Sequence, residues 1–235
     1  PLFEVGKELG VGFHLGYAEK LTGEDGVTHY FNTAILVDRN GEISGKYRKI
    51  HLPGHAEPQP NQPHQHLEKR YFEVGDLGFP AFRTMDGIMG MCICNDRRWP
   101  ETFRVMGLQG VELIMLGYNT PAANAVGPES FHVRMMHNHL SMQAGAYQNA
   151  TWVIGVAKAG CEDDNDLMGG SVIIAPTGEI VSQCRTLEDE LITADCDLDA
   201  CNFAKATIFN FAAHRRVEHY GLITERTGAE PPPEE

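Results

Sequence analysis

The sequence predicts a single α/β domain in which helices cover β-sheet. Short apolar segments of strand length, bounded by Gly, Pro, Asn or Asp, recur along the chain. Segments with helical spacing of apolar residues separate some of them, which favours a layered α/β arrangement. The 235 residues are enough for one large domain with a substantial core. The predicted strands are residues 11–17, 30–37, 87–94, 111–117, 151–157, 171–175 and 191–195.

Three helices and two hairpins connect these strands. The helices are predicted over 2–9, over 100–109 with Pro100 in the first turn, and over 129–148. The first hairpin, ILVDRNGEISG, turns at Asn-Gly, a pair that suits a type I′ turn. The second, VIIAPTGEIVS, turns at Pro-Thr-Gly. The two hairpin sequences are similar. Either they form structurally equivalent, pseudo-symmetric strand pairs, or two unrelated hairpins use the same turn residues.

Two segments stand apart from this pattern. Residues 51–70 are rich in His, Pro and Gln and predict a long ordered loop, a kind of loop that is often functional. The final residues, ending PPPEE, predict a disordered tail over 226–235. The domain is therefore expected to span residues 1–225.

Composition and charge narrow the class of protein. The chain has 19 Lys and Arg against 32 Asp and Glu, for a net charge of −13, which disfavours binding to nucleic acid or an anionic membrane. No apolar stretch reaches the length of a transmembrane helix. The six cysteines are scattered and form no CxxC pair, which argues against a disulfide framework or a structural zinc site. A reducing, cytoplasmic setting is expected.

The segment MGMCICNDRRWPE carries the main candidate for chemistry. An apolar strand ends at Cys94, charged residues follow at once, and a helix begins after them. Enzymes of the α/β class place nucleophiles at such strand ends, and nearby cations favour the thiolate form of a cysteine. The alternative is a buried structural cysteine, which is the interpretation favoured for Cys92, deeper in the apolar strand.

A second segment, GKYRKIHLPG, places Lys49 where a strand runs into a tight loop. A run of cations usually marks a solvated strand end. A lysine at a strand end could instead stabilise an oxyanion if it faced a nucleophile.

Several motifs in order resemble one enzyme family. RKIHLPG resembles the lysine motif of the nitrilase superfamily, CICNDRRWPE resembles its cysteine motif, and GGSVIIAPTGEI resembles the strand pair that follows. QHLEKRYFEVGD is similar to the segment that holds the superfamily's auxiliary glutamate. With GYNTP, LSMQAGAYQN and HYGLI, the stretch 1–223 is most similar to the N-carbamoyl-D-amino-acid amidohydrolases.

This resemblance implies a fold, a reaction and a set of residues. The fold is a four-layer α-β-β-α sandwich, here expected to lack its first strand-helix-strand portion and, with it, the family's remaining catalytic glutamate. The activity of residues 1–235 alone is therefore in question. The reaction is hydrolysis of an N-carbamoyl-D-amino acid to the D-amino acid, ammonia and carbon dioxide, without a cofactor. A homodimer or homotetramer is also implied.

By position in the motifs, Cys94 is the expected nucleophile, Lys49 the catalytic lysine and Glu68 the auxiliary glutamate. Arg97 and Arg98 are expected to bind the substrate carboxylate, because arginine suits bidentate carboxylate recognition. A structural salt bridge with Asp96 or Glu101 is the alternative for at least one of them. The other expected pocket residues are Asn95, His51, His66, His137, Asn119 and Thr120.

No metal site is expected, because the spacing of His51, His55, His64 and His66 matches no common zinc pattern. Two other functions stay open. One is a different amidase of the same superfamily, such as an aliphatic amidase or a ureidopropionase. The other is a catalytically incomplete chain that only binds ligand.

Overall fold

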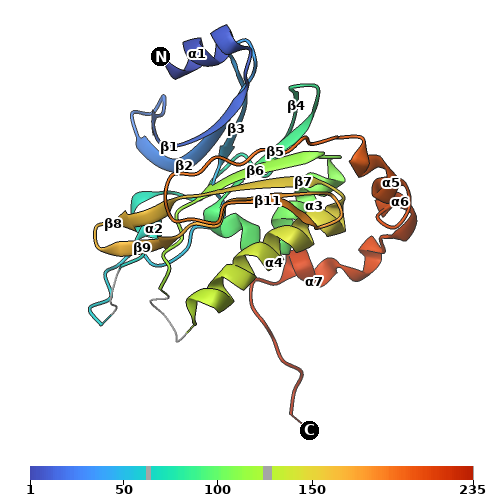
Figure 1. Cartoon of the computed structure of the whole chain (residues 1–235). Helices are drawn as coiled ribbons and strands as arrows, with labels where there is room; N and C mark the ends of the chain where they lie inside the picture. Colours follow the sequence, from blue (N-terminus) through green and yellow to red (C-terminus); the bar gives the residue numbers. More distant parts are fainter. Residues whose placement is uncertain (62–64, 124–128, 235) are drawn as a thin grey trace.

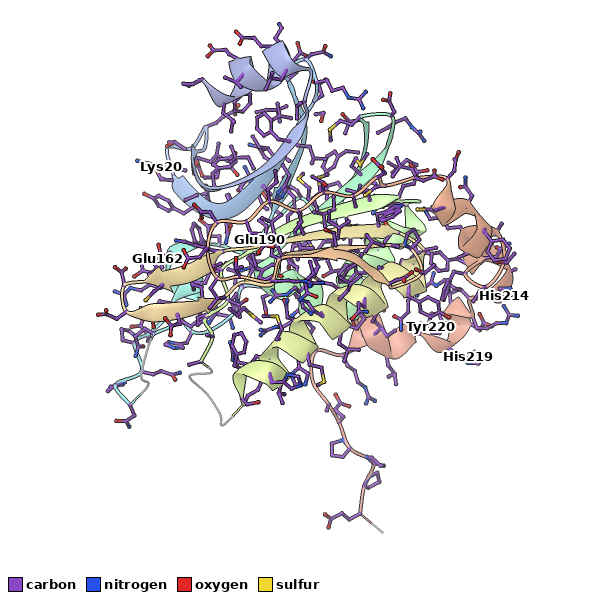
Figure 2. The ribbon with its side chains drawn as sticks, viewed as in Figure 1. Lys20, Glu162, Glu190, His214, His219 and Tyr220 are labelled. Carbon is purple, nitrogen blue, oxygen red and sulfur yellow. The ribbon has the colours of Figure 1, made fainter. Side chains whose placement is uncertain are left out.

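The structure, a computed structural model, describes residues 1–61, 65–123 and 129–234. Its elements form four layers (Figure 1): α1, a three-stranded sheet, a six-stranded sheet, and the helices α3 and α4. The predicted α/β sandwich is confirmed. Side chains fill the space between the layers (Figure 2). In the described part of the chain, no helix is both long and apolar enough to cross a membrane.

The three-stranded sheet is an antiparallel meander in the order β1-β2-β3. Its strands and the helix before it are α1 (Leu2–Leu9), β1 (Phe13–Thr22), β2 (Thr28–Val37) and β3 (Ile43–Arg48). The α1 helix ends at Gly10, which takes a positive φ of 64° as a left-handed cap. Phe3 of α1 packs edge-on against Phe13 of β1, which fixes the helix against the start of this sheet.

The six-stranded sheet has the order β11-β10-β7-β6-β5-β4, and its three central strands β5, β6 and β7 are parallel. Parallel strands need crossovers, which α3 and α4 supply. Because β5 and β6 run in the same direction, the segments that follow them emerge at the same edge of the sheet. The strands are β4 (Ala81–Thr84), β5 (Gly87–Ile93), β6 (Leu113–Tyr118), β7 (Trp152–Ala157), β10 (Val172–Ile174) and β11 (Ile180–Gln183).

Helices cover the outer face and the end of the six-stranded sheet (Figure 1). Figure 2 shows His214, His219 and Tyr220 projecting from the C-terminal segment, beside this helical layer. A small hairpin of β8 (Ala159–Glu162) and β9 (Asn165–Met168) stands apart from both sheets. The helices after α1 are α2 (Glu68–Tyr71), η1 (Cys94–Arg98), α3 (Pro100–Leu108), α4 (Phe131–Asn149), α5 (Ala200–Ala206), α6 (Phe211–His214), η2 (Val217–His219) and α7 (Gly221–Glu225).

The two similar hairpin sequences fold alike. In each, the backbone N–H of the residue after the first strand donates to a carbonyl four residues on, from Asp38 to Glu42 and from Ala175 to Glu179. In each, the turn glycine takes a positive φ. The predicted type I′ turn is wrong, because only Gly41 of the Asn-Gly pair has positive φ. The Asp38 carboxylate accepts from the backbone N–H groups of Asn40 and Glu42, which favours the observed geometry.

The predicted strand over 191–195 is also wrong. This segment alternates as a strand would, and Ile192 and Ala194 pack against the core. It pairs with no neighbouring strand in the described chain, so it is extended backbone without a ladder. One side of this extended segment is packed against the core. This gives the same alternation of apolar and polar residues as a strand, which is why a strand was predicted. The expected disordered tail over 226–235 stays a prediction.

A buried ion network ties the three-stranded sheet together next to Lys49. Glu19 of β1 is 7% exposed and accepts from Arg48 Nε at 2.8 Å, Lys46 Nζ at 2.8 Å and Thr33 Oγ1 at 2.8 Å. These contacts, led by Arg48, lower the pKa of the Glu19 carboxyl to about 2. Because Arg48 is the last residue of β3, the network fixes the point from which the Lys49 loop departs.

Candidate active site

Cys94 lies on a sharp turn at the end of β5. The strand ends at Ile93, and the 3-10 turn Cys94–Arg98 follows without an intervening loop. Cys94 has φ +48°, a conformation rare for a residue with a side chain. Such strained backbone clusters at functional sites, and nucleophiles are held in this way on strand-to-helix turns. Cys94 is partly exposed there, whereas Cys92 is fully buried.

Cys92 belongs to the core, as expected. Burial raises its pKa well above the ordinary range, and the charge of Asp96 raises it further. Lys49 and Arg97 act in the opposite direction on the same thiol. Charges from the segments that follow β3 and β5, strands of different sheets, therefore act on this one buried thiol.

The Asp96 carboxylate connects those two segments. It is fully buried and accepts four hydrogen bonds, two at each oxygen. Oδ1 accepts from the His51 backbone N–H at 2.9 Å and contacts His51 Nδ1 at 2.9 Å. Oδ2 accepts from Tyr47 Oη at 2.7 Å and from the Ile93 N–H at 2.9 Å. Since an ionised carboxylate only accepts, Nδ1 is the protonated nitrogen of His51.

Lys49 is hydrogen-bonded to Glu68, the residue predicted as the auxiliary glutamate. Lys49 Nζ donates to Glu68 Oε1 at 2.6 Å, and the two side chains are 1% and 14% exposed. Asn32 Nδ2 donates to the same oxygen at 2.9 Å, and the Asn32 carbonyl accepts from the Lys49 N–H at 2.8 Å. An ammonium has three N–H donors. Glu68 accepts from one of them, and the described residues show no second acceptor for Lys49 Nζ.

A cavity of about 690 Å³ opens beside Cys94. Its walls come from the loop after β3, the turn after β5, the segment after β6 and the helix α4. Seven of the predicted site residues line it: Cys94, Asn95, Arg98, Asn119, Thr120, His66 and His137. Lys49, Glu68, His51 and Arg97 are not among the residues that line it.

The two adjacent arginines have different surroundings. Arg97 is 1% exposed; its guanidinium donates to Asn138 Oδ1 at 2.8 Å, to Thr120 Oγ1 at 3.0 Å and to the Cys94 carbonyl. It also stacks over the Tyr118 ring, 4.1 Å from the centroid. This geometry makes Arg97 a support for the Cys94 turn. Among the described residues, Arg97 forms no salt bridge with Asp96 or Glu101, the structural alternative considered for it. The groups to which it donates are all neutral.

Arg98 faces the cavity and forms no side-chain hydrogen bond or ion pair with any residue in the described ranges. Burial, and then the charge of Arg97, lower its pKa. Arg134 also lines the cavity, and its Nε is buried without a hydrogen-bond partner in the described part of the chain. Arg134 is otherwise paired, because its terminal nitrogens donate to Glu129 Oε2 at 3.4 Å and to the Pro121 carbonyl at 2.8 Å. The guanidinium of Arg98 therefore makes this wall suitable for an anion.

The three predicted histidines are not equivalent. His51 does not line the cavity, and its ring stacks on Phe79 and Trp99 at centroid distances of 5.8 and 5.0 Å. His66 and His137 line the cavity. His137 Nδ1 is 2.6 Å from Glu129 Oε1, a carboxylate that also contacts Arg134 at 3.4 Å.

Several residues of this site escaped the sequence-based prediction. Asp96 had been considered only as a partner for arginine, and Tyr47, Asn138, Glu129 and Arg134 were not singled out. The signal for Asp96 was its place two residues after Cys94 within the cysteine motif. No group of three or more His, Cys, Asp or Glu residues in the described ranges is arranged to hold a metal ion.

Comparison with known proteins establishes the family. A model of the carbon-nitrogen hydrolase family matches residues 2–206. The chain is 30% identical to an N-carbamoylputrescine amidase from Solanum lycopersicum over 233 residues, which cover 96% of this chain and 72% of that protein. It is 28% identical to a citrullinase from Francisella tularensis, over 84% of this chain and 66% of that protein. A carbon-nitrogen hydrolase structure from Helicobacter pylori superposes with a TM-score of 0.81 at 23% identity, over 96% and 75% of the two chains.

The chain therefore belongs to the carbon-nitrogen hydrolase family, the nitrilase superfamily, and is a hydrolase of C–N bonds. These relatives are named for N-carbamoylputrescine and citrulline, so they do not show the narrower assignment to N-carbamoyl-D-amino acids. Because the family match begins at residue 2, it gives no support to the expected loss of a first strand-helix-strand portion, which stays a prediction.

Proposed function

We propose that this site hydrolyses the ureido group of an N-carbamoyl amino acid, with the D-amino-acid series as the preferred substrate. The proposal rests on one observation: Cys94, on a strained turn, and the guanidinium of Arg98, which has no partner among the described residues, line the same cavity. A thiol can attack a ureido carbon, and a free guanidinium can hold a carboxylate. N-carbamoyl amino acids carry both groups.

In the proposed reaction, the Cys94 thiolate attacks the ureido carbon and the carbonyl oxygen becomes an oxyanion. The Lys49 ammonium and the Asn95 backbone N–H stabilise that charge. Collapse of the tetrahedral intermediate breaks a C–N bond and releases ammonia, which leaves a carbamoyl thioester on Cys94. Water then cleaves the thioester and regenerates the thiol. The released carbamate decomposes to the amino acid and carbon dioxide.

Glu68 keeps Lys49 in position during this sequence, because its carboxylate is already hydrogen-bonded to Nζ. Asn119, Thr120, His66 and His137 surround the substrate in this proposal, since all four line the cavity. Arg97 is proposed to hold the Cys94 turn and Thr120 in place. Its effect on binding of the substrate carboxylate is therefore indirect.

A substrate panel tests the proposal. Ammonia release is measured with matched N-carbamoyl-D- and N-carbamoyl-L-amino acids, citrulline, N-carbamoylputrescine and a simple aliphatic amide. The proposal expects the highest kcat/KM for an N-carbamoyl-D-amino acid. A preference for N-carbamoylputrescine, which lacks a carboxylate, would refute it and favour the activity named for the tomato relative. A preference for the aliphatic amide would favour the alternative of another amidase.

We also propose a homo-oligomer in which a second copy covers the outer face of the helical layer. The helices α3, α4 and α7 expose several large apolar side chains, and contact with a second copy would bury them. They include Val105 and Leu108 of α3, Leu140 and Tyr147 of α4, and Ile223 of α7. Sedimentation analysis of Leu108→Glu tests this: the mass should fall to that of a monomer, and an unchanged mass would refute the proposed face.

A further inference from the structure

We infer that Asp96 is a positioning residue that sets the place of the Lys49 ammonium relative to the Cys94 thiol. This inference rests on the proposed roles of Lys49 and Cys94 and deepens them. All four hydrogen bonds of the Asp96 carboxylate are already made. A carboxylate with about four lone-pair sites has none left for a substrate or a proton, so its role is to hold other groups.

The donors to Asp96 come from both sides of Lys49. Tyr47 lies two residues before it, and the His51 backbone lies two residues after it. Tyr47 Oη also accepts from the Ile50 N–H at 3.1 Å, so the loop is fixed on each side of the lysine. Asp96 itself lies two residues after Cys94.

The Cys94 turn is held by the same carboxylate. Oδ2 accepts from the N–H of Ile93, the residue before Cys94, and so closes the turn in which Cys94 keeps its positive φ. A second contact joins the turn to the lysine loop, because Asn95 Nδ2 donates to the His51 carbonyl at 3.1 Å. Asp96 is therefore the buried connection between a loop of one sheet and a turn of the other.

Asp96→Asn is the sharpest change, because it keeps the size of the side chain and replaces one acceptor with a donor. Each carboxylate oxygen accepts from one backbone N–H, Oδ1 from His51 and Oδ2 from Ile93. Tyr47 Oη and His51 Nδ1 could reverse their roles, but a backbone N–H cannot. Whichever way the amide is turned, one backbone N–H faces an NH₂ group, and one of the two segments must shift.

A shift of about 1 Å in a catalytic group can cost about 100-fold in rate. Asp96→Asn is therefore expected to lower kcat by about 100-fold and to change KM little, because Asp96 does not line the cavity. Asp76→Asn is the matched control. Asp76 is half exposed, accepts from Arg48 next to Lys49, and has no contact with the Cys94 turn. Its kcat is expected to be unchanged.

The deciding experiment is a double-mutant cycle of Asp96→Asn with Lys49→Gln, measured as kcat of folded protein. If Asp96 acts through Lys49, Asp96→Asn has little further effect once the lysine is gone. Independent, multiplying effects would overturn the inference, as would an unchanged kcat in folded Asp96→Asn. If Asp96→Asn does not fold, Tyr47→Phe removes one of the four donors, and an unchanged kcat in that variant would overturn it.

A second readout separates this inference from the proposed function. The rate of Cys94 alkylation by iodoacetamide, followed on its peptide by mass spectrometry, needs no substrate. Because a nearby cation favours a reactive thiolate, Asp96→Asn should slow alkylation, and this effect should vanish in the Lys49→Gln background. If the wild-type protein hydrolyses no ureido compound but shows this pattern, the proposed function fails and the positioning role stands. An equal rate in wild type and Asp96→Asn would overturn the positioning role.

Discussion

Replacement of Lys49 by Gln would remove the charge proposed to stabilise the oxyanion. Loss of one donor to a developing oxyanion costs about 10²–10³ in kcat, or about 2.7–4 kcal/mol. The structure places Lys49 at the upper end of that range, since its side chain is 1% exposed and little water can replace the charge. We therefore expect kcat to fall by about 10³, with a smaller change in KM.

The same substitution also leaves Glu68 without its cation. A carboxylate that is 14% exposed and loses its partner destabilises the fold, so thermal unfolding must be measured with turnover. Lys69→Gln is the matched control, because Lys69 is exposed and adjacent to Glu68 in sequence. Ammonia release from an N-carbamoyl amino acid is the assay. A folded Lys49→Gln protein with wild-type kcat would refute the proposed role of Lys49.

Two further predictions concern substrate binding and pH. Arg98→Gln should raise KM for carboxylate-bearing substrates by about 10–100-fold, which corresponds to the loss of a charged hydrogen bond, and should leave KM for N-carbamoylputrescine unchanged. Arg185→Gln, at an exposed arginine, is the control. An equal rise in KM for both substrates, or an equal rise in the control, would contradict this prediction. Glu19→Gln should lower the free energy of unfolding at pH 7 by about 3 kcal/mol, because the folded pKa is about 2 instead of the usual 4.5. That contribution to stability is fully present above about pH 4.5 and is lost as pH falls towards 2. The free energies of unfolding of the two proteins, measured with urea, should therefore converge in acid. A difference that stays constant with pH, or a similar loss of stability in the exposed control Glu24→Gln, would contradict this prediction.

Much of the fold could be predicted because its signals are local. The strands around Cys92 and Ile114 are short apolar runs between breakers, and α4 has helical spacing over its whole length. The strands β4, β8 and β9 were missed because each has only four residues. The short helices after residue 199 were missed for the same reason, since their boundaries depend on packing against the sheet.

The candidate site divides in the same way. Cys94 and Lys49 could be singled out because each lies within one continuous motif. The role of Asp96 could not, because its four hydrogen bonds come from residues up to 49 positions away in sequence. Arg97 and Arg98 have the same chemistry and are adjacent, so only the structure could show that one is enclosed by Asn138 and Thr120 while the other faces the cavity.

The role of Cys94 as nucleophile is tested most directly by identification of the residue that carries the covalent intermediate. The protein is mixed with an N-carbamoyl-D-amino acid, quenched in acid during turnover, digested and analysed by tandem mass spectrometry. We expect an adduct of the substrate minus ammonia on Cys94, and we expect Cys94→Ala to show neither the adduct nor turnover. An adduct on another cysteine, or hydrolysis at the wild-type rate by Cys94→Ala, would contradict the role of Cys94 as nucleophile.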